Sequence, residues 1–359
     1  MAAPTAVTAG STTYEVVEDV EVAFDAIASG SVTDDVTGRA PRALVSVQAG
    51  GEGLIGKYLD AGVWCVACDL DRFLPGYPAN AQTFDVVLSA PGYRTVSLTV
   101  TIPAGATIPL AAGAVQLRPL PVRLQGRVTR STLDPSPVAG AIVRVADRPG
   151  QALASLRTAL HGAHALGTSV APVDVSPTGT ERTLTAPAES GAQTVALDDV
   201  TGLAGLVVGF DWQHELELAA VEAVDAAAST VELAGPLTRT YPNGTVLKQF
   251  DVTSPPGPPP TRMLVRAADA GDGLLVLDGP VDPATAAVQV DNPATPQVEY
   301  VALGALADAD GFYAFEGIGG IETIDLRARE TPPSPEGPRF SQTLDYGRLT
   351  NVVNVKLAP

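Results

Sequence analysis

Two aspartates next to a glycine are the first residues in the chain whose spacing could support chemistry. Asp308 and Asp310 precede Gly311 in the stretch ADADGFYAF. Carboxylates this close together could contribute to a Ca²⁺ site, which takes about six to eight oxygen ligands. The four residues after Gly311 are Phe, Tyr, Ala and Phe, and none of them adds a carboxylate. We therefore predict a turn without a metal, in which the aspartates bond their own backbone and Gly311 takes a positive φ.

A CxxC pair is the second candidate. Cys65 and Cys68 are the two cysteines of the chain, and such a pair can be a redox centre or half of a zinc site. A zinc site would need two more ligands, and no second Cys or Cys/His pair supplies them. A redox pair is expected at a helix N-terminus, whereas residues 63–68 alternate like a strand. Residues three apart in a strand point to opposite faces with Cα atoms about 10 Å apart, too far for a disulfide, so we predict two reduced cysteines.

The histidines are the third candidate group. His161 and His164 have the spacing of neighbours on a helix and could share a metal if a carboxylate joined them, but their segment contains no acidic residue. His214 lies beside Trp212 in the alternating stretch DWQHELEL. We predict packing or solvent-exposed roles for all three histidines.

Motifs that would indicate an enzyme are absent from the sequence. It contains no nucleophile elbow, P-loop, dinucleotide-binding glycine pattern or HExxH motif. The glycine-rich stretch GIGG, residues 317–320, lies between two predicted strands, and no helix follows it to bind a phosphate. Asn243 fits a glycosylation sequon, but YPNGT favours a two-residue turn. We predict no catalytic, cofactor-binding or metal-binding residues, no cofactor and no enzymatic activity.

The composition favours short strands joined by many turns. The 359 residues include 35 glycines and 31 prolines, and Val and Thr are abundant. Hydrophobic residues make up 45% of the chain, enough for packed cores in two or three domains. The formal net charge of −18 disfavours nucleic acids and anionic membrane surfaces as partners.

The N-terminal sequence MAAPTAVTAGSTTYEVVEDV has neither a basic segment nor a continuous apolar segment. It does not have the pattern of a secretory signal peptide, and no run of apolar residues is long enough for a transmembrane helix. We expect cytoplasmic synthesis without a signal peptide and no membrane insertion.

Internal repetition gives the domain organisation. Residues 30–49 and 126–146 both begin with Gly-x-Val-Thr, pass through a polar turn and a proline, and end in an alternating strand. The first copy continues directly. The second resumes much later, with GFYAF in the place of GKYLD and IDLRA in the place of WCVAC. We predict an all-β fold with two β-sandwiches: residues 1–120, with an extended N-terminal arm, and a split sandwich of residues 121–150 plus 303–359.

Residues 151–302 are then an inserted domain, and this insert repeats within itself. Residues 181–200 resemble residues 261–280, and LELAAVEAV resembles VEYVALGAL. We predict two repeated small β-modules with a stiff proline-rich linker near residues 253–262.

The entry to the insert has some helical character. Leu153, Leu156 and Leu160 recur at helical spacing, although Gly162 and Gly167 weaken the pattern. We predict a short helix or an ordered loop there.

The pattern GRVT…PVAGAIVRV followed by DADGFYAFEGI…IDLRA resembles the carboxypeptidase-regulatory-like, or transthyretin-like, β-sandwich family. The resemblance covers residues 123–148 plus 308–357, and more loosely residues 20–120. In peptidases that carry such a module it is accessory to a zinc-binding catalytic domain, and this chain offers no ligands for one. The resemblance therefore implies Ig-like β-sandwiches rather than peptidase activity.

The insert stretch SGAQTVALDDVTGLAGLVVG…PLTRTYPNGTVL resembles small β-modules that recur in phage tail and contractile injection system proteins. Together the two resemblances imply a non-enzymatic structural or assembly component of a contractile injection system or phage tail-like particle, at the baseplate, the collar or the outer decoration. Its partners would be other protein subunits of that particle or virion, in a homo-oligomer or symmetric assembly. The alternative is an adhesin module that binds glycans or cell surfaces, against which the missing secretion signal and the few aromatic residues count.

Overall fold

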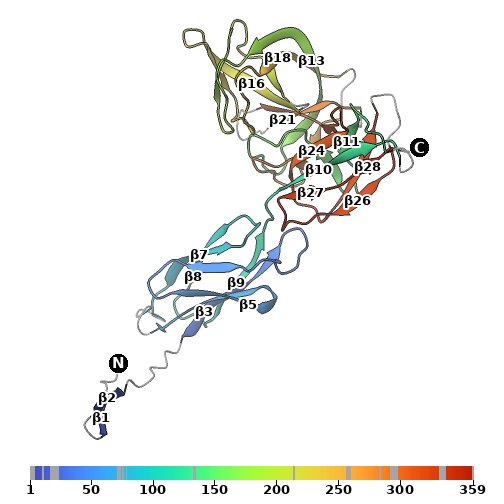
Figure 1. The fold of residues 1–359 in the computed structure, drawn as a ribbon. Coiled ribbons are helices and arrows are strands. Elements are labelled where there is room, and N and C mark those ends of the chain that lie inside the picture. Colours follow the sequence, from blue (N-terminus) through green and yellow to red (C-terminus); the bar gives the residue numbers. More distant parts are fainter. Residues whose placement is uncertain are drawn as a thin grey trace. The chain divides into compact units, whose positions relative to one another are not determined.

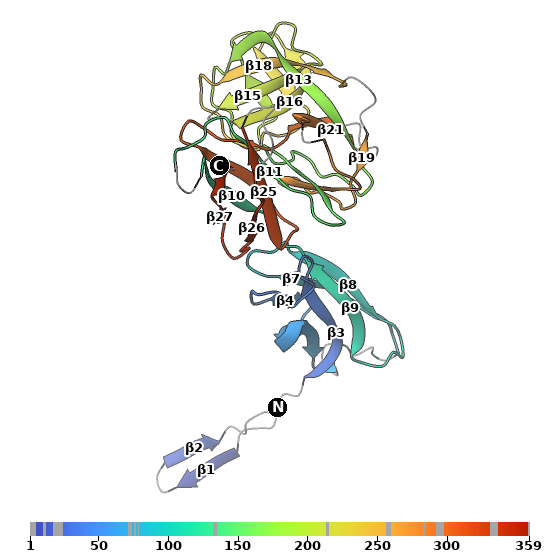
Figure 2. The ribbon, with the colours of Figure 1, turned by 90° about the vertical axis from the view of Figure 1, so that its right-hand side faces the viewer.

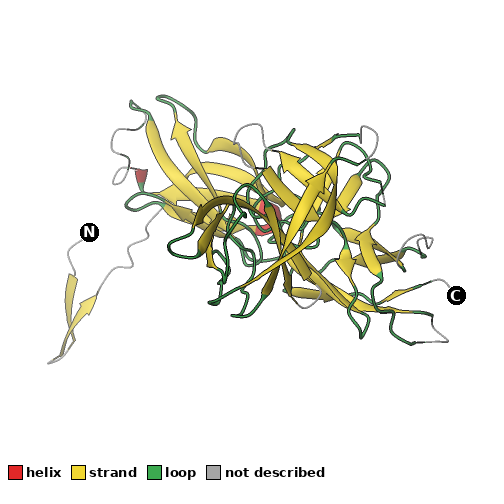
Figure 3. Cartoon of the chain, turned by 90° about the horizontal axis from the view of Figure 1, so that it is seen from above, coloured by secondary structure: helices red, strands yellow, loops and turns green. Residues whose placement is uncertain are grey.

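The computed structural model consists almost entirely of β-strands and turns, which confirms the predicted all-β fold class (Figures 1 and 3). Contacts along the chain divide it into two compact units, Met1–Pro119 and Leu120–Pro359. Among the residues described, no helix has the length and apolarity needed to cross a membrane. The structure describes residues 5–9, 12–16, 24–70, 74, 77, 79–131, 135–212, 215–255, 260–282, 284–291, 298–330 and 337–357.

The first unit contains a sandwich of two sheets. One sheet has the order β5-β6-β3-β9 and the other has the order β4-β7-β8. Alternate residues of each strand face the core, so Trp64, Val66 and Cys68 are buried while the residues between them are partly exposed. The strands of the first sheet are β3 (Asp25–Asp34), β5 (Ile55–Leu59), β6 (Val63–Cys68) and β9 (Leu110–Leu117), with a 3₁₀ turn (Asp60–Gly62) between β5 and β6; those of the second are β4 (Ser46–Ala49), β7 (Gln82–Ser89) and β8 (Val96–Ile102).

An N-terminal hairpin precedes this sandwich. β1 (Thr5–Ala9) pairs antiparallel with β2 (Thr12–Val16), and within the described part of the chain these two strands form a sheet of their own.

A second sandwich lies in the second unit and is built from two distant parts of the sequence. β10 (Val122–Thr129) is central in one sheet, antiparallel to β24 (Phe312–Ile318) and parallel to β27 (Thr350–Val352) and β28 (Val355–Lys356). The facing sheet has the order β23 (Ala305–Leu306), β11 (Ile142–Val145), β25 (Thr323–Arg329) and β26 (Phe340–Thr343).

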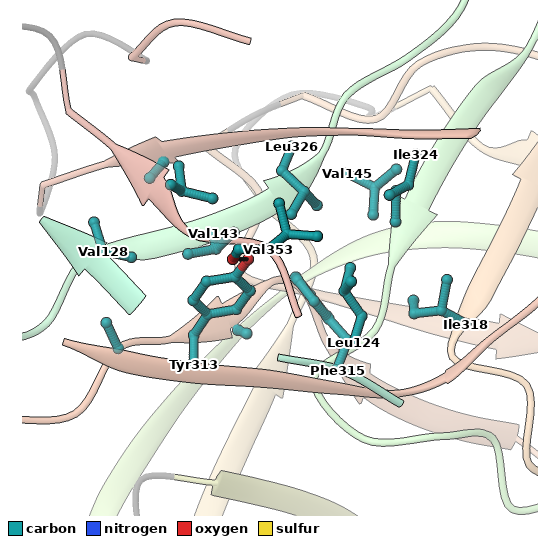
Figure 4. Close-up of a cluster of buried hydrophobic side chains, with 14 of the residues drawn as sticks. Leu124, Val128, Val143, Val145, Tyr313, Phe315, Ile318, Ile324, Leu326 and Val353 are labelled. Carbon is teal, nitrogen blue, oxygen red and sulfur yellow. Dashed lines mark hydrogen bonds between the residues drawn. The ribbon is translucent and has the colours of Figure 1, made fainter. Parts of the chain in front are cut away.

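Figure 4 shows the core between these two sheets. Tyr313 and Phe315 of β24 are buried there with Val143 of β11 and Leu326 of β25. The hydroxyl of Tyr313 donates to the carbonyl of Val353 at 2.6 Å, so the one polar atom of this ring is satisfied inside the core.

The two sandwiches share most of their strand pairings, but two of our strand assignments are wrong. Gly30 of β3 pairs with Trp64 of β6, and Gly126 of β10 pairs with Tyr313 of β24. GFYAF therefore corresponds to β6, which contains WCVAC, and not to GKYLD. IDLRA, in β25, corresponds to β7, because β25 pairs with β11 as β7 pairs with β4. The predicted match was displaced by one strand because neighbouring strands have the same period-two pattern.

A nine-stranded sheet forms most of the insert (Figure 2). Its order is β14-β17-β16-β15-β18-β13-β21-β22, with β19 also paired to β13. The long strand β13 pairs with β18 through its second part and with β21 through its first part, so it belongs to both halves of the sheet. The strands are β13 (Ser169–Thr183), β14 (Thr194–Ala196), β15 (Val207–Trp212), β16 (Glu215–Asp225), β17 (Thr230–Leu233), β18 (Val246–Thr253), β19 (Arg262–Met263), β21 (Ala287–Asp291) and β22 (Val298–Ala302).

The hydrogen bonds of the insert repeat, and they reveal a nested arrangement. An inner module, residues 184–253, has counterparts in an outer module formed by residues 152–175 plus 262–303. The outer module is therefore interrupted by the inner one, whereas the sequence suggested two modules in succession. The matching backbone bonds are Leu184 to Thr245 and Leu264 to Thr168, Ala188 to Tyr241 and Ala268 to His164, and Gly191 to Leu237 and Gly271 to Leu160.

The two modules are related by an approximate two-fold axis. Val175 of β13 and Val252 of β18 occupy corresponding positions in the repeat, and they pair with each other. When a residue pairs with its own counterpart, a two-fold axis that exchanges them passes between the two residues. The insert therefore has the geometry of a symmetric dimer within one chain.

The entry to the insert, predicted as a short helix or an ordered loop, is a short strand followed by turns. β12 (Ala152–Ser155) pairs with β20 (Leu274–Leu277). Leu153 packs into the core of the second sandwich, whereas Leu156 and Leu160 pack into the core of the outer module. The helical spacing of these leucines reflects burial in two different cores and not one face of a helix.

Candidate functional site

Two glutamates on corresponding strands of the insert form the centre of the most highly charged buried cluster described. Glu217 is on β16 of the inner module, Glu299 is on β22 of the outer module, and these two strands lie against each other. The strands alternate, so a residue that faces inward is normally apolar. Glu217 is 0% exposed and Glu299 is 8% exposed, so both carboxylates require partners.

Glu217 has a donor for each carboxylate oxygen. The backbone N–H of Thr238 donates to Oε1 at 2.7 Å, and the hydroxyl of Tyr241 donates to Oε2 at 2.6 Å. Nε2 of His161, from the outer module, lies 2.7 Å from Oε1. Glu217 therefore binds its own module and the neighbouring one.

Glu299 is bound in the same manner. The backbone N–H of His161 donates to Oε1 at 2.6 Å, and Nε2 of His164 lies 2.9 Å from Oε2. His161 and His164 are the counterparts of Thr238 and Tyr241 in the repeat, so the two glutamates have matching environments. His161 departs from this symmetry, because its ring contacts both glutamates.

The electrostatics favour a charged His161. Its Nε2 faces Glu217 at 2.7 Å and its Nδ1 faces Glu299 at 3.3 Å. A neutral imidazole can donate from only one nitrogen, whereas the imidazolium donates from both. Burial alone would lower the pKa of His161, but the hydrogen bond to Glu217 and the charges of both glutamates outweigh it and raise that pKa.

The other members of the cluster complement this cation. Burial would raise the pKa of Glu217, but the hydrogen bond and the charge of His161 outweigh it and hold that pKa below its ordinary value. Burial and the nearby charge of Glu217 raise the pKa of Tyr241 far above its usual range, so the phenol stays a neutral donor. The imidazolium of His161 thus lies between the carboxylates of Glu217 and Glu299.

This arrangement fits a structural joint better than a catalytic site. A cavity of about 140 Å³ borders His161, His164, Glu299 and Tyr300. The cavity is small, and both oxygens of each glutamate already accept hydrogen bonds. Across the described residues, no group of three or more His, Cys, Asp and Glu side chains has the geometry to hold a metal ion.

The sequence contains a signal for this cluster that we overlooked. The segment around His161 and His164 holds no acidic partner, because the partners of these histidines come from β16 and β22. The repeated stretches LELAAVEAV and VEYVALGAL both have glutamate at their second position, Glu217 and Glu299. An acidic residue at the same place in two alternating strands was evidence for a shared buried role.

The ion pair between His161 and Glu217 is expected to make the stability of the second unit depend on pH. The raised pKa of His161 contributes stability fully below the ordinary value of 6.5, and the contribution is lost as pH rises through the folded-state value. The lowered pKa of Glu217 contributes stability above the ordinary value of 4.5, and the contribution is lost as pH falls through the folded-state value. The free energy of unfolding of the wild type minus that of His161→Gln should therefore be greatest between these two values, as measured by urea unfolding from pH 3 to pH 9. A difference that does not vary with pH would contradict the charged pair.

The aspartates that first suggested a metal site form a turn, as predicted. Oδ1 of Asp308 accepts the backbone N–H groups of Asp310 at 2.9 Å and of Phe312 at 2.8 Å. Gly311 has a φ of 74°. These contacts stabilise the turn that leads from β23 in one sheet to β24 in the other.

Replacing Asp308 with alanine should lower the free energy of unfolding by about 1 kcal/mol, the usual worth of a side chain that satisfies backbone N–H groups. The Asp310→Ala variant is the matched control and should change stability much less. Chemical denaturation of both variants measures the difference. Added Ca²⁺ should not raise the stability of the wild type, and a stabilisation by millimolar Ca²⁺ would restore the metal interpretation.

The cysteines and Asn243, which the sequence also offered as candidate sites, lie on a strand and in a turn. Cys65 and Cys68 lie on β6 and not at a helix N-terminus, which confirms the predicted strand position; Cys65 is partly exposed and Cys68 is buried. Asn243 lies in a turn, with Gly244 at a φ of 86°. His214 lies outside the described residues.

Comparison with protein-family models gives no match, and neither does comparison with curated proteins. A solved structure that matches is a variant of BcpA, the major pilin subunit of Bacillus cereus, with 9% sequence identity. The match covers 94% of this chain and 100% of the pilin chain at a TM-score of 0.22. A TM-score this low is no evidence for a shared function.

Proposed function

We propose that the chain is a non-enzymatic structural subunit of a contractile injection system or phage tail-like particle, and that it acts by docking to neighbouring subunits. The sequence resemblances of the sandwiches and the insert motivate this choice of particle. The three-part organisation, with sandwiches at residues 1–120 and at 121–150 plus 303–359 and an insert at residues 151–302, is part of the proposal.

The observation that carries the proposal is an apolar outer face on the first sandwich. β5 is at the edge of its sheet, and it pairs with β6 so that Leu59 lies opposite Val63 and Ile55 lies opposite Ala67. Leu59 and Val63 are 46% and 40% exposed. Single exposed apolar residues are ordinary. Here exposed apolar residues lie on both sides of Lys57 on an edge strand, and such an edge is suited to contact with another protein.

The way in which the insert is joined to the second sandwich supports a structural role. Leu153 and Leu274 of the β12–β20 ribbon pack into the core of the second sandwich, and the N–H of Gly273 donates to the carbonyl of Gly317 in β24 at 2.7 Å. The insert is therefore joined to this sandwich by shared core and backbone bonds. Within the insert, the buried side chains of His161, Glu217 and Glu299 hold the two modules together.

The test is incorporation into particles. The chain, tagged in its native cell, should co-purify with sheath and tube subunits, and it should be visible as density in the intact particle. Leu59→Glu and Val63→Glu should leave the isolated chain folded, because neither side chain belongs to the buried core, but should deplete it from the particle fraction. Leu166→Glu, which alters a 67% exposed leucine of the insert, is the matched control. A wild-type chain that is absent from sheath-containing particles would refute the proposal, and binding to a glycan array by the monomer would favour the adhesin.

A further inference from the structure

We propose that the chain pairs with a second copy of itself through β8 (Val96–Ile102), so that the three-stranded sheets of two copies join into one sheet. β8 is the last strand of the sheet β4-β7-β8 in the part of the chain that the structure describes. The backbone N–H and C=O groups along such an edge can pair with a strand of another chain. The inference concerns a different edge from that of β5 and does not depend on the kind of particle proposed above.

β8 lacks the features that usually protect an edge strand, which are charged side chains, prolines, bulges and short length. Its sequence VSLTVTI has no charge and no proline, and all seven residues pair with β7 in an unbroken register. The other edge strands of this sandwich are protected. β5 carries Lys57 and β4 has four residues. β9 contains Gly113 at a φ of 87°, and its register with β3 shifts between Ser29 and Ser31.

The backbone of β8 directs every second residue to the free edge. On β7, the carbonyl of Asp85 accepts the N–H of Gly50 at 2.7 Å, on the side of β4. The N–H and C=O of one residue in an antiparallel sheet point to the same side, so Thr99, which lies opposite Asp85, directs its backbone groups away from β7. Ser97 and Thr101 lie two positions away on either side and have the same orientation.

An antiparallel pairing centred on Thr99 uses all of these groups. Thr99 would lie opposite Thr99 of the second copy, and Ser97 would lie opposite Thr101. Each such pair exchanges two hydrogen bonds, so the interface would contain about six. Leu98 would lie opposite Val100 of the second copy, and both belong to the core of the sandwich or pack against it. A strand that pairs with itself has a two-fold axis, so the contact closes a dimer and does not continue into a fibre.

The distribution of charge allows this interface and makes it depend on salt. A pairing of β5 centred on Lys57 would put two like charges opposite each other, whereas β8 has none. Asp85 lies beside the interface, and its Oδ1 accepts the hydroxyl of Thr99 at 2.6 Å. The two copies of Asp85 would be three strand spacings apart, about 14 Å, which exceeds the Debye length of about 8 Å at physiological ionic strength. Because each chain has a formal net charge of −18, salt should strengthen the dimer by screening the repulsion between copies.

The experiment is analytical ultracentrifugation of the purified full-length chain over a series of protein concentrations, at low and at high concentrations of NaCl. A reversible equilibrium between monomer and dimer is expected, with more dimer at high salt. Thr99→Lys and Thr99→Glu should each raise the Kd of the dimer by about tenfold or more, because each puts like charges opposite each other at the two-fold axis. Circular dichroism should show that both variants remain folded, since the side chain of Thr99 is exposed.

An equimolar mixture of the Thr99→Lys and Thr99→Glu chains should form dimers again, because opposite charges then meet at the axis. Thr83→Lys is the matched control. Thr83 is exposed on the same face but lies on β7, one strand inside the edge, so this variant should dimerise like the wild type. A wild-type chain that stays monomeric at every concentration and salt condition would overturn the proposal. So would oligomers larger than a dimer, an equal loss of dimer in Thr83→Lys, or a mixture that does not recover.

Discussion

Replacing Glu217 with alanine is expected to lower the free energy of unfolding of the second unit by about 3–5 kcal/mol, the usual cost of removing one partner from a buried ion pair. The variant leaves the imidazolium of His161 with only Glu299, and it removes the acceptor of Tyr241 and of the Thr238 N–H. Urea unfolding monitored by circular dichroism measures the change.

Glu222→Ala is the matched control, because Glu222 is on the same strand and is exposed. It should change stability by no more than about 0.5 kcal/mol. The double variant His161→Ala with Glu217→Ala should cost less than the sum of the two single variants, because the pair is a coupled unit. Additive losses would show that the two residues act independently. They would contradict the interpretation that His161 and Glu217 form a coupled contact between the two modules.

A single methyl group at Gly126 is expected to be at least as damaging. A Cβ at this position would lie 1.7 Å from the carbonyl oxygen of Val353. The contact is with backbone, so β10 and the end of β27 would have to separate. We expect Gly126→Ala to lower the free energy of unfolding by about 3 kcal/mol or more, at or above the upper end for overpacked cores.

Gly162→Ala provides the control for the added methyl group, since nothing lies within 4 Å of a Cβ there. It should be close to neutral in the same urea titration. Gly30, the counterpart of Gly126 in the first sandwich, has a comparable restriction, with the carbonyl of Gly113 2.6 Å from its Cβ position. If Gly126→Ala unfolds at the wild-type urea concentration, the close approach of β10 and β27 is not a requirement of the fold.

The all-β fold could be predicted because its signals are local. Glycine, proline and alternating apolar residues determine turns and strands within a few positions of each other. The shared Gly-x-Val-Thr opening was also informative, since both glycines allow a close backbone approach and both pair with a buried aromatic residue. The turn at Asp308 was predictable for the same reason, because its hydrogen bonds reach only four residues along the chain.

The parts that the sequence did not reveal depend on distant pairings. GFYAF was matched to the wrong strand because period-two patterns are alike in all strands, and only register distinguishes them. The partners of His161 lie on β16 and β22, far from it in the sequence, so a search of its own segment could not find them.

The nesting of the modules has a consequence for biosynthesis. β10 is made before the whole insert, but its partners β24, β27 and β28 leave the ribosome only after the insert has been made. The inner module, by contrast, is a continuous stretch whose strands pair locally, and the outer module can close only after it. Chains tend to form near contacts before distant ones, because closing a long loop costs more entropy. We therefore expect the inner module of the second unit to fold first, the outer module second and the split sandwich last. β10, the first strand of this unit, would remain unpaired for the longest time.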